Sequence, residues 1–407
     1  MLDRVLSKIN DQKQTVIDLQ RKMVNIPALS PNNGGEGERD KAEYLKSYLA
    51  SIGLTDIKSF DAPDPRVPGG VRPNFAVIIP GQDTSRTFWS VGHMDVVPPG
   101  DASEWKTNPF ELVVDGDTLY GRGVEDDQHG IVGSLLLAKA LVEEKIVPPI
   151  NYGILLVSDE ETNNQYGINY VMENHKDFFG ADDMFLVPDF GTDTSDLIDI
   201  AEKSVFWLKF TVQGQQAHAS RPDDGCNSLT ASAALIVALR DLYKRFDLQD
   251  PLFTPPRSTF EATKKESNVG SINILPGRDV FYMDCRVLPP YDLEDVLKTI
   301  CTTNECIAKD YGVTVSCDVV QRTQAADPTH TDSDIVKRLI TSIRDVYGCE
   351  AKPVGVSCFT VSCGLRKAGF STAAWSTFND SPHKPNEHSS IALILKDAAV
   401  MARVLFK

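Results

Sequence analysis

The chain has 407 residues, a length that predicts two or three folding units. Its formal net charge is -16, and the absence of a basic block argues against a nucleic-acid-binding protein. Residues 1–23 lack the apolar core of a signal peptide, and no segment reaches the roughly 18 apolar residues of a membrane span. We therefore expect a soluble, cytoplasmic protein whose partners are small solutes or proteins, with no nucleic acid and no membrane.

All eight cysteines lie between Cys226 and Cys363, and they form neither a CxxC pair nor a zinc-ribbon spacing. This scatter favours buried thiols in a reducing compartment over a structural zinc site.

Helices and strands alternate in the first half of the chain. One opening helix is expected from Val5 to Met23, and a second from Glu38 to Ile52. Three apolar runs then follow, NFAVIIPG, TFWSVGHMDVV and NYGILLVSDEE, each bounded by Pro, Gly or polar residues as buried strands are. The apolar helix HGIVGSLLLAKALVEE lies between the last two runs. This alternation predicts an α/β sheet.

The order of elements changes after Glu202. The strand SVFWLKFTVQG and the helix NSLTASAALIVALRDLYKRF precede two strands at hairpin distance, NVGSINILPG and DVFYMDCRVLP. The helix LEDVLKTICTTNECIAKDYG and the strand VTVSCDVVQ complete a βαββαβ order, which predicts a ferredoxin-like unit of about 120 residues. A further helix and the strand STAAWST return to the first sheet. We therefore expect a catalytic domain of residues 1–202 and 322–407, with a small domain of residues 203–321 inserted in it.

The run WSVGHMDVVPPG places a histidine and a carboxylate at the end of an apolar strand. Alternate side chains of a strand point to the same face, so His93 and Asp95 share a face. A carboxylate beside a metal-binding histidine can accept the ring N–H that the metal does not use. A strand-end histidine with satisfied hydrogen bonds explains this motif equally well, so the pair alone leaves both interpretations open.

More acidic residues follow the later apolar runs. Asp126 precedes the apolar helix, where a carboxylate either caps the helix or bridges two metal ions. Glu160 and Glu161 follow a buried strand, at the edge where an α/β sheet has its ligand crevice. Asp189 ends FLVPDF in the same way, and the loop STFNDSPHKPNEH supplies His383. Together these side chains predict a metal site in one crevice.

Seven motifs resemble those of the M20 metallopeptidases, the group of acetylornithine deacetylase, succinyl-diaminopimelate desuccinylase, aminoacylase and glutamate carboxypeptidase. They are VGHMDVVPPGD, LYGRGVEDDQHG, SDEET, GQQAHASRPDDGCNSL, INILPG, DCR and PHKPNEH, in the family's order over nearly the whole chain. The resemblance implies an α/β catalytic domain with a mixed central sheet, two zinc ions per subunit, and an inserted lid domain that forms a homodimer. Oxygen and imidazole ligands without a thiolate also suit cobalt or manganese.

The resemblance also implies which residues bind the metal ions. His93 and Asp189 would hold one zinc ion, and Glu161 and His383 the other. Asp126 would bridge the two ions.

Other roles in the catalytic domain follow from the same resemblance. Asp95 would orient the metal-binding histidine, and Glu160 would be the general base. The peptide bond from Asp126 to Asp127 would be cis. His388 competes with His383 of the same loop as a ligand, but the family's histidine precedes the PNE motif, which selects His383.

In the lid, His218 matches the family's histidine that stabilises the oxyanion, often from the partner subunit. A surface-loop histidine is the alternative. Arg286 in DCR and Asn273 in INILP match positions that bind the substrate's carboxylate and line the closed site, and an Arg fork suits a carboxylate.

The chain departs from the family's pattern at two places. Cys358 stands in GVSCFTVSC, where many relatives have a glycine-rich turn. Glu202 and Lys203 replace the paired arginines of the desuccinylase branch, which argues against succinyl recognition, although Lys203 could still meet an anion. Asp189 is typical of the family's dipeptidase branches, whereas the deacylases and carboxypeptidases tend to carry Glu at this position.

The leading interpretation is a zinc-dependent hydrolase that cleaves the amide bond of a small dipeptide or N-acyl amino acid. A desuccinylase or acetylornithine deacetylase is the alternative within the family. A catalytically silent binding protein on the same fold is the alternative outside it, but such a protein needs no general base at Glu160.

Overall fold

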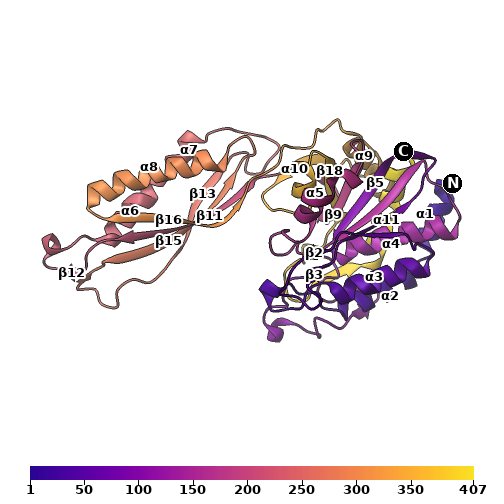
Figure 1. Ribbon diagram of the computed structural model, residues 1–407, viewed down its shortest axis with the longest axis horizontal. Helices are drawn as coiled ribbons and strands as arrows, with labels where there is room; N and C mark the ends of the chain where they lie inside the picture. Colours follow the sequence, from indigo (N-terminus) through magenta and orange to yellow (C-terminus); the bar gives the residue numbers. More distant parts are fainter. The chain divides into compact units, whose positions relative to one another are not determined.

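The computed structural model describes all 407 residues, and they form two compact units (Figure 1). The first unit consists of residues 1–200, 329–354 and 360–407, and the second of residues 201–328 and 355–359. All of the expected inserted domain, 203–321, lies in the second unit. The short segment 355–359 also belongs there, although it lies between elements of the first unit along the chain.

An eight-stranded sheet forms the centre of the first unit, in the order β1-β4-β8-β5-β9-β18-β10-β17. The four central strands pair in parallel. β4 pairs antiparallel with β1 and β8, and β10 pairs antiparallel with β18, so the expected mixed sheet is confirmed. The strands are β1 (Ile57–Ser59), β4 (Phe75–Ile79), β5 (Asp83–His93), β8 (Ile150–Val157), β9 (Met184–Thr192), β10 (Leu197–Glu202), β17 (Lys352–Val356) and β18 (Ser371–Thr377).

Helices cover both faces of this sheet. One face packs against α4 (Gln128–Glu143), α9 (Asp334–Tyr347) and α11 (Ile391–Phe406), with α1 (Leu2–Asn10) and α2 (Lys13–Val24) outside them. The other face packs against α5 (Ile168–His175) and α10 (Ser362–Lys367), and α3 (Arg39–Ser51) lies near the N-terminal helices in Figure 1. None of the helices combines the length and the apolar character that crossing a bilayer requires.

The single helix expected from Val5 to Met23 is wrong, because the chain breaks between α1 and α2. Asn10 and Asp11 favour helix ends, because Asn and Asp side chains can compete with helical hydrogen bonds. Gln12 then buries its side chain and donates to the backbone oxygen of Leu136 at 3.0 Å.

The first unit also contains two small sheets of short strands, outside the central sheet. They are β2 (Ala62–Pro63), which pairs with β3 (Val71–Arg72), and β6 (Val113–Asp115), β7 (Thr118–Tyr120) and β19 (His388–Ser390), which form a three-stranded sheet.

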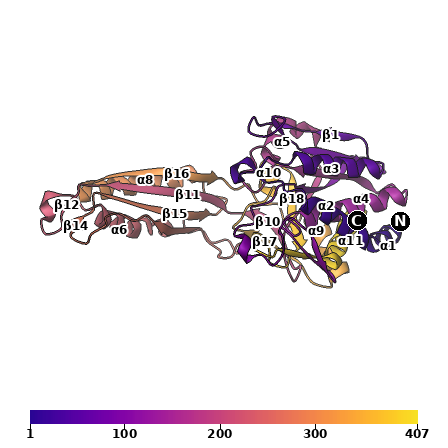
Figure 2. The same ribbon diagram turned by 90° about the horizontal axis from the view of Figure 1, so that it is seen from below.

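The second unit has a four-stranded antiparallel sheet in the order β13-β15-β11-β16, and α6 and α8 lie along one of its faces (Figure 2). This is the order of a ferredoxin-like unit, so the expected lid domain is confirmed. The elements are β11 (Ser204–Gln213), β12 (Ala217–His218), α6 (Ser228–Leu239), α7 (Leu242–Arg245), β13 (Thr259–Lys265), β14 (Ile274–Leu275), β15 (Arg278–Val287), α8 (Leu293–Tyr311) and β16 (Thr314–Thr323).

The expected position of the second lid strand is wrong. NVGSINILPG forms only β14, which pairs with β12, and β13 takes its place in the sheet. Gly270 and Pro276 weaken a strand in that run. β13 lies at the edge of the sheet and exposes most of its residues, so it lacks the apolar pattern that marks a buried strand.

The expectation of buried thiols is wrong for part of the cysteines. Cys285 and Cys363 are buried, but Cys301, Cys306 and Cys358 are exposed. Two of the exposed cysteines lie on the outer face of α8, whose inner face is formed by leucine, valine and isoleucine.

Close packing at one glycine gives a stability prediction. Gly153 in β8 lies against the indole of Trp89, which is fully buried, so a methyl group there would overlap the ring. We expect Gly153→Ala to lower the free energy of unfolding by about 1–3 kcal/mol, measured by denaturant titration. Gly270→Ala is the control, because nothing lies within 4 Å of a methyl group at that position. Equal unfolding midpoints for both variants would contradict the prediction.

Candidate metal centre

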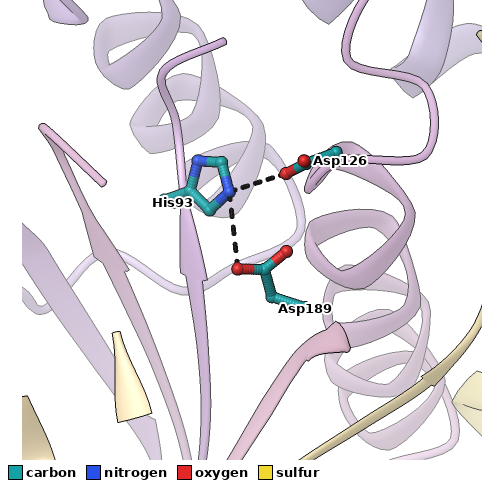
Figure 3. Close-up of side chains that lie close together, drawn as sticks. All are labelled: His93, Asp126 and Asp189. Carbon is teal, nitrogen blue, oxygen red and sulfur yellow. Dashed lines mark hydrogen bonds and ion pairs between the residues drawn. The ribbon is translucent and has the colours of Figure 1, made fainter. Parts of the chain in front are cut away.

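Three of the candidate ligands meet where parallel strands of the first unit end. His93 is the last residue of β5, Asp189 lies in the neighbouring strand β9, and Asp126 lies in the turn before α4. Figure 3 shows both carboxylates turned toward the imidazole. The Nε2 atom of His93 is 3.0 Å from Oδ1 of Asp126 and 3.7 Å from Oδ2 of Asp189. The three side chains can therefore surround one cation.

A second group shares Asp126 with the first. The Nε2 atom of His383 is 3.1 Å from Oδ2 of Asp126 and 3.1 Å from Oε2 of Glu161. Each oxygen of the Asp126 carboxylate thus faces a different histidine. In both groups the ligand atoms lie within 4.8 Å of one another, which is a spacing that one metal ion can span.

Asp95 acts on the site through two different groups. The His93 Nδ1 atom lies 3.1 Å from the backbone oxygen of Asp95, which can only accept a hydrogen bond. The ring therefore carries its proton on Nδ1, and Nε2 is free to bind a metal. The Asp95 carboxylate, with Oδ1 3.5 Å from Nδ1, accepts the backbone N–H groups of Glu160 at 3.1 Å and Glu161 at 3.0 Å. Asp95 thus positions the two glutamates as well as the ring.

The site contains more acidic groups than cations. Burial raises the pKa of Glu161 to about 7 and the pKa of Asp189 to about 6, and the charge of Asp126 adds to both shifts. Burial also raises the pKa of Glu160 well above its usual range. Hydrogen bonds to Asp126 and Glu161 raise the pKa of His383 to about 11. Carboxylate oxygens and imidazole nitrogens that crowd together in this way fit a divalent cation.

The structure bears on two alternatives that the sequence left open, helix capping by Asp126 and metal binding by His388. Asp127, not Asp126, is the residue that precedes the first turn of α4, so Asp126 does not cap the helix. The bond between these two aspartates is cis. His388 belongs to neither ligand group, and its Nδ1 atom lies 3.2 Å from the backbone oxygen of Asn386.

Two further residues near the ligands escaped the sequence analysis. Glu125 and Glu387 are fully buried, and each accepts backbone N–H groups from the loop that carries the other. Both lie inside motifs quoted above, but nothing local marks them, because their partners are more than 250 residues away in the chain.

His218 and Asn273 lie together in the lid. His218 pairs with Ile274 between β12 and β14, and the backbone oxygen of Asn273 accepts the N–H of Ala219 at 2.9 Å. The Nδ1 atom of His218 accepts the N–H of Ser220 at 3.1 Å, so this ring carries its proton on Nε2. The exposed His218 therefore presents a hydrogen-bond donor to its surroundings.

The other lid candidates have partners within the second unit. Arg286 forms two hydrogen bonds with Asp284, at 2.8 and 3.0 Å, and donates to the backbone oxygen of Ser357 at 2.6 Å. Arg286 therefore lies beside the segment that contains Cys358. Lys203 is buried and donates to two backbone oxygens at 2.7 Å.

Comparisons with known proteins identify the family and the fold of this chain. The family model "Peptidase family M20/M25/M40" matches residues 90–407. An uncharacterized metallohydrolase of Methanocaldococcus jannaschii is 36% identical over 97% of this chain and all of that protein. A succinyl-diaminopimelate desuccinylase of a Sulfurovum species is 26% identical over 94% of this chain and 95% of that protein. The dipeptidase Dug1p of Saccharomyces cerevisiae has the same fold, with a TM-score of 0.73 at 17% identity over all of this chain and 98% of that chain.

Proposed function

This chain belongs to peptidase family M20/M25/M40, and we propose that it is a dizinc hydrolase that cleaves the amide bond of a small dipeptide or N-acyl amino acid. One observation supports this function above the others. Two ligand groups share Asp126, while Glu160 lies beside them and belongs to neither. Such a site has places for two metal ions and also a carboxylate that remains available for proton transfer.

The residues present fit two zinc ions. His93 and Asp189 would hold one ion, Glu161 and His383 the other, with Asp126 between them. When bound, the ions would polarise the scissile carbonyl and make the attacking water more acidic. Cobalt or manganese would also suit these donors.

Glu160 is the general base of the proposed reaction. Its carboxylate takes a proton from the attacking water and delivers it to the nitrogen of the leaving amine. Burial raises the pKa of Glu160, which makes the carboxylate a stronger base and the acid form a usable donor. The hydrogen bond from its backbone N–H to Asp95 holds this residue in place.

The lid would complete the site through a homodimer, in which His218 serves the catalytic domain of the partner subunit. The donor on His218 Nε2 suits a developing oxyanion. The edge strand β16 exposes Val319 and Val320, and an open antiparallel edge can pair with the same strand of a second chain. Arg286 and Asn273 would contact the carboxylate of the substrate.

The chain's own residues favour a dipeptide or a simple N-acyl amino acid over a succinylated substrate. The resemblance implies paired arginines at this place in the desuccinylase branch, and here Glu202 and Lys203 stand there, both buried. Desuccinylation is the second candidate activity, because one relative is named a succinyl-diaminopimelate desuccinylase.

Hydrolysis and metal dependence can be tested together. We expect the purified protein with zinc, cobalt or manganese to release free amine from at least one class among dipeptides and N-succinyl, N-acetyl and N-carbamoyl amino acids. A chelator should abolish this activity and added metal should restore it, because the proposed reaction needs the metal ions to polarise the carbonyl and to activate the water. Amine release is followed by a colorimetric assay, and bound metal by elemental analysis. Two bound ions without hydrolysis of any substrate would instead support a binding protein.

A further inference from the structure

Glu387 organises the turn that carries Asp126. Its carboxylate accepts the backbone N–H groups of Gly123 at 2.9 Å, Glu125 at 2.9 Å and Asp126 at 3.1 Å, and also Nη1 of Arg122 at 2.6 Å. These donors all belong to residues 121–127, here called the Asp126 turn, which lacks helix and strand. One side chain therefore holds three backbone N–H groups of this turn.

Glu125 makes the reciprocal contacts. It lies in the Asp126 turn, and its carboxylate accepts the N–H of Ser381 at 3.0 Å, the Oγ–H of Ser381 and the N–H of Asn379. Both partners belong to residues 378–387, here called the His383 loop, which connects β18 to β19. Each loop thus holds the other through one buried glutamate.

The His383 loop has an irregular backbone. Asp380, His383 and Asn386 all have φ between 56° and 62°, the left-handed region that most non-glycine residues avoid and that Asp, Asn and His adopt more readily. The His383 side chain is 57% exposed, so core packing does not hold it. The contacts of Glu125 with Asn379 and Ser381 tie the start of this loop to the Asp126 turn, and the contacts of Glu387 tie its end.

We propose that Glu125 and Glu387 are positioning residues. They hold the Asp126 carboxylate between the two ligand groups before any metal ion binds. This inference rests on the proposed dizinc site. According to this inference, two glutamates that are not ligands help to set the positions of the ligands. Glu387 acts on Asp126, which both groups share, and Glu125 acts on the loop of His383, which only one group uses.

Glutamine is the informative replacement, because it keeps the volume of the side chain. Both oxygens of Glu387 accept from N–H donors. In Glu387→Gln, one oxygen becomes an NH₂ group that faces N–H donors without an acceptor. The same mismatch arises in Glu125→Gln, where one oxygen faces Asn379 and the other faces Ser381.

The two variants should differ in the metal ions that they lose. We expect Glu387→Gln to weaken the binding of both zinc equivalents about 10–100-fold, and Glu125→Gln to weaken one equivalent by that factor and leave the other within about threefold. Binding is measured on the metal-free full-length protein by competition with a chromogenic chelator. The shift in melting temperature on zinc addition is an independent readout.

The control is a buried carboxylate with the same kind of contacts away from the ligands. Asp183 accepts the N–H of Thr87 at 2.7 Å, Nε1–H of Trp89 at 2.8 Å and the N–H of Gly180 at 2.9 Å. Asp183→Asn should lower the melting temperature while both zinc affinities remain within about threefold of wild type.

The outcomes separate this inference from the proposed function. A wild-type protein that binds no zinc overturns the dizinc site itself. A wild-type protein that binds two ions, with Glu125→Gln and Glu387→Gln indistinguishable from Asp183→Asn, overturns the positioning pair alone. If the glutamine variants do not fold, Ser381→Ala decides. It removes the hydroxyl that donates to Glu125, together with the contacts of that hydroxyl with the backbone of His388, while both glutamates stay in place. This variant should weaken one zinc equivalent severalfold, and unchanged affinity would overturn the proposal.

Discussion

Replacement of Glu160 by glutamine is expected to lower kcat by several orders of magnitude, about 10²–10⁴-fold, while two metal ions stay bound. The amide has nearly the same shape as the carboxylate but cannot take a proton from water. Because Glu160 belongs to neither ligand group, its replacement removes no metal donor. Steady-state kinetics and elemental analysis of the same preparation measure both quantities.

The neighbouring glutamate provides a matched contrast. Glu161 lies 3.1 Å from His383 Nε2 in one ligand group, so Glu161→Gln should lose metal as well as activity. The pair of adjacent substitutions therefore separates proton transfer from metal binding. Activity of Glu160→Gln within about tenfold of wild type would contradict its assignment as the general base.

Removal of the His218 side chain is expected to lower kcat about 10²–10³-fold, because one hydrogen-bond donor to the oxyanion is lost. The proposed homodimer adds a sharper expectation. Inactive His218→Ala protein and inactive Glu160→Gln protein, mixed and allowed to exchange subunits, should regain up to about half of the wild-type activity per mixed dimer. One of the two sites in a mixed dimer then has both an intact Glu160 and a histidine from the partner.

His330 is the control for this experiment. It is also exposed, and its Nδ1 atom accepts the N–H of Asp332 at 3.1 Å, much as His218 accepts the N–H of Ser220. His330→Ala should retain wild-type kcat. Absence of recovery despite demonstrated subunit exchange, or full activity in a monomeric variant, would show that His218 does not act in the partner's site.

Local patterns were sufficient to locate the candidate ligands. His93, Glu161 and Asp189 lie at or after the ends of apolar runs, and parallel strands bring such ends to one edge of a sheet. Strand periodicity and element order likewise predicted the α/β sheet and the ferredoxin-like lid. These features depend on residues that are neighbours in the chain, so a sequence displays them directly.

The contacts that organise the site could not be predicted in this way. Glu125 and Glu387 find their N–H partners more than 250 residues away, and an isolated glutamate in a loop resembles any solvated charge until the two loops meet. The lid strand β13 was missed for a related reason, since an edge strand with exposed charged residues has little apolar signal. The sequence by itself therefore determined which elements and ligand types are present. Only the tertiary structure decided which buried carboxylates hold the ligands in place, because burial and hydrogen-bond partners arise from contacts between segments that are distant in the chain.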